Sequence, residues 1–206
     1  MRRITKVFAI LIAFAGVSGP AAAQAVIGSV VRCAGTCVGV SEGRSESLTS
    51  GSVVHLNEKL TTDVGARLEV AFDDGTRVTL GEKAELVLDD FVYRPSGASR
   101  FHAAASGSFR YISGKLGPGA SRVATVTTPV ALIGVRGTDF WGGTLSGVSG
   151  VVVFTGSVSV TTAAGTVILS GPGEGTDLSD ASVAPSPASQ WSQARIAAAL
   201  ASVAFP

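Results

Sequence analysis

The two histidines and two pairs of adjacent aspartates are the candidates for acid–base chemistry in this sequence, namely His55, His102, Asp73, Asp74, Asp89 and Asp90. The histidines lie in separate segments without a metal-ligand cluster, and each aspartate pair lies beside the end of an expected strand, where solvated acids are common. Adjacent strand residues point to opposite faces, so neither pair is arranged to share a proton. Metalloprotease, serine-hydrolase and nucleotide-binding motifs are also missing. We therefore expect no enzyme, no cofactor and no metal, with a hydrolase of convergent acids as a less favoured alternative.

The two cysteines, Cys33 and Cys37, are separated by three residues with Gly35 in the centre. In an extended strand their Cα atoms would lie about 13 Å apart, whereas a disulfide needs roughly 4.4–6.8 Å. A tight turn at Gly35 brings them within reach, so a disulfide and a hairpin here imply each other. The spacing is not the C-x-x-C of redox dithiols, and no second pair completes a zinc site. We predict a structural disulfide between Cys33 and Cys37, with a redox dithiol or half of a metal site as the alternatives.

A third segment whose residues could bind a partner or shape the fold is TPVALIGVRGTDF, at residues 128–140. Pro129 cannot donate a hydrogen bond to a neighbouring strand, which suits a strand start or a sheet edge. A turn at Gly137 would let the Arg136 guanidinium reach the Asp139 carboxylate through two parallel hydrogen bonds. This pair either fixes a tight corner or presents the arginine charge to an acidic group of a partner. The candidate partner-binding or structural residues are Thr128, Pro129, Gly134, Arg136, Gly137, Thr138, Asp139 and Phe140.

Short strands joined by glycine turns are expected to position these residues. Glycine accounts for 26 of the 206 residues, aromatic residues for 6%, and valine, threonine and serine are abundant, which is typical of β-structure. RLEVAF at 67–72 alternates apolar and polar residues, and the Asp74-Gly75 step after it is a strong hairpin signal. The alternation continues at 77–80 and 85–89. We predict an all-β domain over residues 26–180, either solenoid-like or a twisted double sheet.

Residues 140–173 contain no charged side chain. Three runs in this segment, at 151–154, 157–161 and 166–169, are separated by glycines and predict strands. Rungs of a solenoid buried on both faces would have this composition, and so would the central strands of a sandwich. The third interpretation is an exposed surface for a partner. The pattern leaves these three alternatives open.

The N-terminus has the three-part layout of a secretory signal peptide. A basic stretch at 1–6 precedes 11 uncharged apolar residues at 7–17 and small-residue cleavage sites after Ala23 or Ala25. A membrane anchor is the alternative, but 11 helical residues span only about half of a ~30 Å bilayer core. No later segment is apolar enough to span a bilayer. We therefore expect a signal peptide at 1–23 and a periplasmic protein, with a secreted or cell-surface protein as the alternative.

Charge argues against a nucleic-acid partner. Removal of the predicted signal peptide takes away three basic residues and leaves 13 basic and 15 acidic ones, a net charge of −2. Binding to nucleic acid needs a dense positive field that releases counterions. We therefore expect no nucleic-acid partner.

The composition changes after Asp180. Residues 181–189 are rich in proline, serine and alanine and are predicted to form a linker, whereas residues 190–206 are alanine-rich, which favours a helix. Ile196, Leu200 and Val203 fall on one helical stripe, and Ser186 followed by Pro187 suits a cap and first turn. The helical tail either docks on the β-domain or is a flexible tether whose apolar face binds a partner or a membrane.

Residues 128–140 resemble the most characteristic stretch of the FecR family, which runs Thr-Pro-x-Ala and then Ile-Gly-x-Arg-Gly-Thr-Asp-Phe. Further segments resemble family motifs in the same order, at 60–65, 70–80, 84–91, 107–115 (GSFRYISGK) and 154–160. The resemblance covers roughly residues 26–180 and implies an all-β periplasmic module. In full-length regulators such a domain helps to relay the occupancy of an outer-membrane iron-chelate receptor to a sigma factor inside the cell.

This sequence departs from that plan, because it shows no anti-sigma segment before its hydrophobic run and no transmembrane segment that survives cleavage. Little chain follows residue 180. We therefore expect an exported FecR-like binding or sensor module of cell-surface signalling or envelope scaffolding, whose partner is an envelope receptor or membrane sensor. Its contact surfaces are expected at 136–139 and on the charge-free strands. An extracytoplasmic carbohydrate-binding or adhesion-type module is the alternative.

Overall fold

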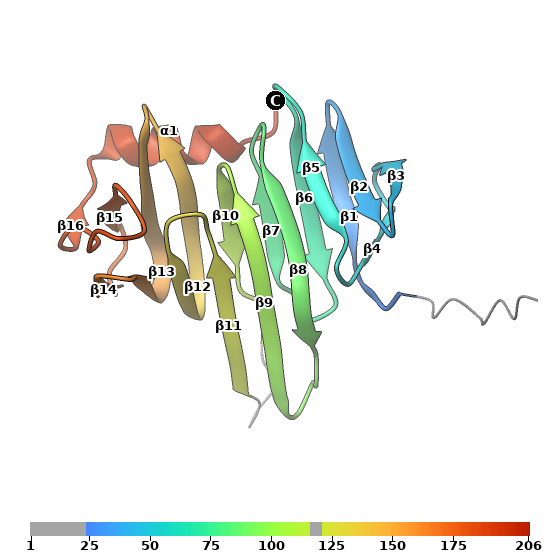
Figure 1. Ribbon diagram of the computed structural model, residues 1–206, viewed down its shortest axis with the longest axis horizontal. Coiled ribbons are helices and arrows are strands. Elements are labelled where there is room, and N and C mark those ends of the chain that lie inside the picture. The colour runs from blue at the N-terminus through green and yellow to red at the C-terminus, as the bar shows by residue number, and fades with distance from the viewer. Residues whose placement is uncertain (1–23, 116–120) are drawn as a thin grey trace, which may run out of the picture.

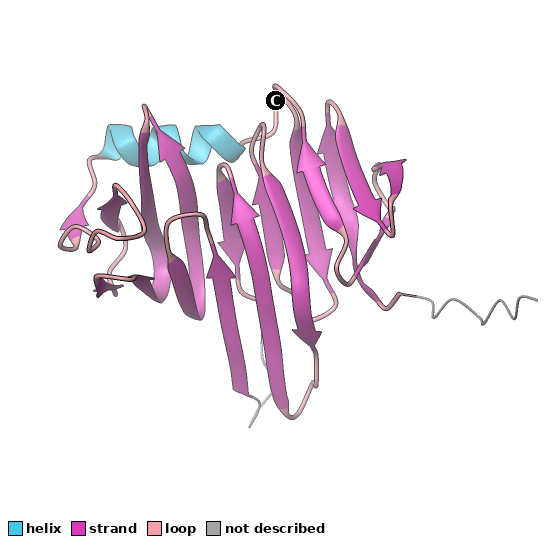
Figure 2. Ribbon diagram, viewed as in Figure 1, coloured by secondary structure: helices cyan, strands magenta, loops and turns pink. Residues whose placement is uncertain are grey.

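The computed structural model describes residues 24–115 and 121–206, so the predicted signal peptide at 1–23 lies outside the described residues (Figure 1). Strands make up most of the described chain, and a helix follows at its C-terminus (Figure 2). The predicted all-β class with a C-terminal helix is confirmed. The elements are β1 (Val26–Ala34), β2 (Cys37–Ser41), β3 (Arg44–Ser47), β4 (Val53–His55), β5 (Lys59–Thr62), β6 (Arg67–Phe72), β7 (Arg77–Leu80), β8 (Glu85–Val92), β9 (Ala98–Ser106), β10 (Phe109–Ile112), β11 (Ser121–Thr127), β12 (Leu132–Leu145), β13 (Val148–Thr162), β14 (Gly165–Leu169), β15 (Glu174–Leu178), β16 (Ser189–Gln190) and α1 (Gln193–Val203).

The strands join into one sheet. Its main path runs β3-β2-β5-β8-β9-β11-β12-β10-β7-β6-β1-β4, and β13 adds β14 and β15 beside β12. Hairpin neighbours such as β6 and β7 are antiparallel, with Val70 opposite Val78 across the predicted Asp-Gly turn. Strands β9 and β11 run parallel because the chain crosses to β10 between them. Most neighbours in space are therefore not neighbours in sequence.

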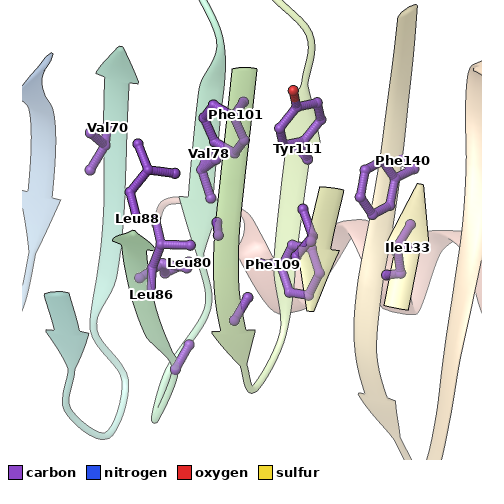
Figure 3. Close-up of a cluster of buried hydrophobic side chains, with 14 of the residues drawn as sticks. Val70, Val78, Leu80, Leu86, Leu88, Phe101, Phe109, Tyr111, Ile133 and Phe140 are labelled. Atoms are coloured by element: carbon purple, nitrogen blue, oxygen red, sulfur yellow. The ribbon is translucent and has the colours of Figure 1, made fainter. Parts of the chain in front are cut away.

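The sheet curls back so that its two halves face each other. Strands β6 and β9 lie far apart along the path, yet the rings of Phe72 and Phe101 lie 5.4 Å apart, edge to face. Tyr111 of β10 meets Phe101 in the same way at 5.3 Å, and Figure 3 shows Phe101 and Tyr111 among aliphatic side chains of the core. The prediction left a solenoid-like arrangement and a twisted double sheet open, and the structure shows one curled sheet whose two halves pack against each other. We call β2, β3, β5, β8, β9 and β11 the β9 half, and β1, β4, β6, β7 and β10 the β6 half.

Strands β12 and β13 connect the two halves. Residues 132–135 of β12 pair with β11, whereas residues 139–142 pair with β10. Strand β13 follows the same bend, so the two strands predicted at 151–154 and 157–161 are one strand, and that part of the prediction is wrong. At the bend, Gly137 and Gly156 have φ angles of 58° and 77°, and a Cβ on Gly156 would lie 2.3 Å from the Gly137 carbonyl oxygen. Glycine lets the strands bend there without a break.

The predicted disulfide between Cys33 and Cys37 is confirmed. It links the end of β1 to the start of β2, and Gly35 turns between them with a φ of 77°. The two Cα atoms lie 6.3 Å apart. Because β1 and β2 belong to different halves, the bond lies where the ends of the curled sheet approach each other.

Helix α1 packs on the outer face of β12 and β13. A second buried cluster forms there, and Trp141 of β12 donates its Nε1–H to Ser202 Oγ of the helix at 3.0 Å. Beyond the helix, the guanidinium of Arg32 in β1 lies 3.8 Å from the centre of the Phe205 ring. The tail is therefore docked on the sheet, as the first of its two alternatives predicted. The members of the buried cluster are Trp141, Val152, Trp191, Ala199 and Val203.

The start of α1 differs from the prediction. Ser192 is the N-cap and accepts a hydrogen bond from the Arg195 N–H at 3.2 Å. The predicted start at Ser186 and Pro187 is wrong, because Ser186 Oγ accepts from the Asp177 N–H at 2.8 Å and so holds the preceding segment against β15. Neither described range, 24–115 or 121–206, contains a helix long and apolar enough to cross a membrane.

Candidate functional site

Thr128 and Pro129 shape the turn that leads into β12. The Thr128 N–H donates to the Ala131 carbonyl oxygen at 2.8 Å, and Thr128 Oγ1 accepts from the Ala131 N–H at 3.0 Å. Pro129 lies outside the strands, where its missing N–H costs no ladder hydrogen bond. The turn also borders a small cavity of about 90 Å³ that is lined by Phe109 and Val151. Both predicted residues therefore fix the path of the chain.

Thr138 stabilises the bend of β12 at residues 136–139, which we call the corner, from its core side. Its side chain is buried, and its Oγ1 donates to the Ser157 carbonyl oxygen at 2.8 Å. Thr138 Oγ1 also accepts a hydrogen bond from the Arg136 N–H at 3.2 Å. The Thr138 N–H donates to Ser113 Oγ at 3.0 Å. These hydrogen bonds tie the bulge at Gly137 both to β13 and to the chain that follows β10.

Asp139 binds Arg110 of β10, so the predicted pair with Arg136 is wrong. Arg110 Nε and Nη2 donate to Asp139 Oδ1 and Oδ2 at 2.9 and 2.7 Å, the bidentate geometry that gives strong charge-assisted hydrogen bonds. The hydrogen bonds that Arg110 donates to Asp139 raise the pKa of Arg110 above its ordinary value. The Arg110 guanidinium also lies 5.5 Å from the centre of the Phe154 ring.

The bend explains why Arg136 and Asp139 do not meet. Ile133 and Phe140 both point into the core, although an odd separation of seven positions would place them on opposite faces of a regular strand, and the bulge at Gly137 absorbs the difference. Asp139 is thereby placed on the outer face of the β6 half and Arg136 on the outer face of the β9 half. Both lie on the convex side of the bend, where side chains splay apart.

Phe140 anchors the corner in the core. Its side chain is fully buried, stacks on Tyr111 at 5.4 Å and meets Phe109 edge to face at 5.9 Å. Burial also raises the pKa of the Tyr111 hydroxyl. The corner is therefore held by aromatic packing on its inner side and by the Arg110–Asp139 pair on its outer side.

Arg136 lies beside a shallow groove of about 400 Å³ on the outer face of the β9 half. Val123 of β11 and Ile168 of β14 line the groove and are 68% and 65% exposed. Gly134 forms part of its floor, and a Cβ there would lie 2.6 Å from Ser159 Oγ. We call the surface formed by Val123, Gly134, Arg136, Ser159 and Ile168 the outer groove.

The charge-free segment differs between the two parts of β13. Val151 and Val153 face the main core and Val152 lies under α1, so this part of β13 is buried on both faces like a central strand of a sandwich. The second part of β13 buries the alternate residues Val158, Val160 and Thr162. Its other face carries Ser157, Ser159 and Thr161, which are half-buried, and a partner surface there stays a prediction.

Asp74 is buried, so the expectation that both members of its pair are solvated acids at a strand end is wrong. Its Oδ2 lies 2.8 Å from Arg122 Nη2, and the two side chains are 2% and 6% exposed. Thr76 also donates its N–H to Asp74 Oδ1 at 2.8 Å. The hairpin therefore turns this carboxylate inward, toward an arginine of the opposite half. The neighbouring Asp73 is exposed.

The second aspartate pair lies on the outer face of the β9 half, and each aspartate contacts a basic side chain. Arg100 donates to Asp90 through Nε at 2.7 Å and Nη2 at 3.2 Å, and this hydrogen bonding lowers the pKa of Asp90. Asp89 contacts His102 Nδ1. The other histidine, His55, lies 3.5 Å from Glu58. Across residues 24–115 and 121–206, no three histidine, cysteine or acidic side chains gather as a metal site.

A comparison with known protein families finds a match for the segment that contains the corner. The family described as "FecR protein" matches residues 58–159, which run from the start of β5 through the bend of β12 and β13. The chain contains a FecR domain. In this protein, residues 128–140, which resemble the characteristic FecR stretch, form the turn before β12 and the bend that joins the two halves of the sheet.

Two solved structures share the fold of this FecR-domain chain. They are crystal structures, at 1.65 and 2.50 Å resolution, of a "putative anti-sigma factor" from Parabacteroides distasonis ATCC 8503. Each has a TM-score of 0.56 and 18% sequence identity over 69% of this chain. The matches span 64% and 63% of those chains, less than two thirds of their length. A search of curated proteins finds no match.

Sequence reasoning missed Arg110 as the partner of Asp139. The segment GSFRYISGK contains it, and the alternation of Phe109, Arg110 and Tyr111 predicts that Arg110 faces away from the core. Nothing local indicates that β10 pairs with β12. Val123 and Ile168 were missed because a single apolar residue in a strand does not reveal whether another layer covers it.

Proposed function

We propose that this chain is an exported FecR-domain protein that works by binding, as a periplasmic component of cell-surface signalling or of an envelope scaffold. One observation carries the proposal: the outer groove is bare, whereas α1 covers the outer face of β12 and β13 around Trp141 and Val152. Exposed aliphatic side chains beside an arginine are typical of protein–protein contact surfaces. We propose that its partner is an envelope protein, either a receptor or a membrane sensor.

Two features support export to the periplasm. The N-terminal segment has the layout of a cleavable signal peptide. The Cys33–Cys37 disulfide is of a kind that persists in oxidising compartments such as the periplasm and is rare in the cytosol. Cell fractionation tests this part. We expect the disulfide-bonded chain in the periplasmic fraction without residues 1–23, and retention in the cytosol with an intact N-terminus would contradict it.

Two observations support a role in binding over one in catalysis: the aspartates discussed above are paired with basic side chains, and the matching family is FecR. Asp74, Asp90 and Asp139 contact arginines and Asp89 contacts His102, and FecR proteins are regulatory. A carboxylate held by an arginine is a poor general base, because the ion pair favours its charged form.

Binding is tested by crosslinking in the native envelope. The full chain with a C-terminal affinity tag is treated with formaldehyde in cells and purified, and a receptor or membrane sensor is expected to co-purify. Val123→Glu should abolish this recovery, because it places a charge in the outer groove. Val64→Glu is the matched control, since Val64 is 66% exposed in the loop between β5 and β6. Equal recovery with both variants would contradict the assignment of this face.

A further inference from the structure

We infer that the outer groove binds an extended acidic segment of a partner protein, with a carboxylate on Arg136 and an aliphatic side chain between Val123 and Ile168. The inference rests on the proposed function and specifies the chemistry of the partner. It follows from the charge, the apolar walls and the floor of the groove.

Arg136 is an unneutralised cation in the described part of this face. Its neighbours Arg100 and His102 contact Asp90 and Asp89, whereas no carboxylate within residues 24–115 or 121–206 reaches Arg136. Its backbone N–H is held by Thr138 Oγ1 at 3.2 Å, which fixes the point from which the side chain projects. An incoming carboxylate therefore gains a bidentate partner without breaking an existing ion pair.

The walls and floor of the groove suit an extended chain. Val123 and Ile168 lie on β11 and β14, with β12 and β13 between them. Neighbouring strands are about 4.8 Å apart, so the three spacings from β11 to β14 make the groove roughly 14 Å wide. This width matches about four residues of an extended chain. Gly134 keeps the floor low, and Ser157 and Ser159 add hydroxyls that can bond the backbone of a bound segment.

Other occupants fit this face less well. A membrane surface would bring many phosphates against Asp89 and Asp90, which lie beside the groove on the same face, as well as one against Arg136. A second copy of this chain could offer Asp90 to Arg136 only by giving up the bidentate bond from Arg100. A single carboxylate on an extended segment of a different protein adds one anion only, and it binds Arg136 without breaking the Arg100–Asp90 pair.

Photocrosslinking tests the inference. The full chain is made in its own envelope with p-benzoylphenylalanine in place of Val123, and the crosslinked peptide is sequenced by mass spectrometry. We expect one envelope protein, crosslinked within about four residues of an aspartate or glutamate and next to an aliphatic residue. Arg136→Glu should lower the yield at least tenfold, and Arg136→Lys should retain part of it. The same probe at Val64 is the control and should give no such product.

A charge exchange makes the test specific. Changing the partner's acidic residue to lysine should restore crosslinking to the Arg136→Glu chain, which a merely structural role of Arg136 would not do. A crosslinked segment without an acidic residue, a product with lipid or with a second copy, or a yield unaffected by Arg136→Glu would overturn the inference. If the partner still co-purifies in the formaldehyde experiment, only this inference falls. If nothing co-purifies, the proposed function falls with it.

Discussion

Helix α1 covers the outer face of β12 and β13 around Trp141 and Val152 (Figure 1). The outer groove lies on the outer face of β11–β14 around Gly134 and Ser159, and it is bare. On the covered face Trp141 and Val152 are 0% exposed, and on the bare face Val123 is 68% exposed. Both faces belong to one sheet with one core. The difference separates the parts of the molecule that hold the fold from the part that is available for contact.

The characteristic FecR corner contributes to both faces. Asp139 extends onto the covered side, where Arg110 holds it, and Arg136 extends onto the bare side. Thr138 and Phe140 between and beside them are buried. A single run of residues thus fixes the bend of the sheet and also presents a charge to the outside.

The largest expected effect comes from the covered face. Trp141→Ala removes a fully buried indole and its hydrogen bond to Ser202, so we expect the free energy of unfolding to fall by about 3–5 kcal/mol. Urea unfolding measures it. Val123→Ala on the bare face should change stability by less than about 0.5 kcal/mol. Similar losses for the two variants would remove the contrast between the faces.

The next effect concerns the disulfide between the ends of the two halves. Replacing Cys33 and Cys37 together by serine should lower the free energy of unfolding by about 2 kcal/mol, because a five-residue loop is no longer closed in the unfolded chain. The measurement is thermal unfolding of the double variant against the oxidised protein. Reducing agent should destabilise the natural chain and leave the double variant unchanged. Separate transitions for the two halves would show that they are independent units, contrary to their shared core.

A third prediction distinguishes the contributions of Arg110 and Arg136, the two arginines near the corner, to stability. Arg110→Ala leaves the mostly buried Asp139 without a partner, and we expect a loss of about 1–2 kcal/mol, in the lower part of the range for charged hydrogen bonds because Arg110 is partly exposed. Arg136→Ala is the matched control and should leave the unfolding midpoint within error of the natural chain. A larger loss from Arg136→Ala would mean that Arg136 holds the corner after all.

The smallest effect is the pH dependence of the pair Asp90 and Arg100 on the bare face. Because Arg100 lowers the pKa of Asp90 below its ordinary value of 3.8, the folded state holds this carboxylate charged more readily than the unfolded state does. The stabilisation is therefore present above pH 3.8 and is lost as the pH falls through the lowered value. Unfolding midpoints of the natural chain and Asp90→Asn should differ slightly at neutral pH and converge in acid. A difference that grows in acid would contradict this assignment.

Much of the fold could be predicted from local patterns, and the corner only in part. The alternation at 67–72 and the Asp74-Gly75 step predict β6, β7 and their turn correctly, since a hairpin depends on residues adjacent in sequence. The start of α1 was predicted wrongly because Ser186 has a partner on β15 and Ser192 caps the helix instead. The residues at 128–140 mark an unusual place, but their spacing does not reveal which side chain each charge meets.

The sequence by itself determined the strand class, the Asp-Gly hairpin, the disulfide and the C-terminal helix, because each depends on residues a few positions apart. Only the tertiary structure decided that Asp139 binds Arg110, that Asp74 is buried against Arg122, and that Arg136 faces solvent. These outcomes depend on which distant strands become neighbours and on the direction in which the sheet bends at Gly137. A curled sheet brings together residues that are separated by tens of positions, and α1 then covers one of its two outer faces.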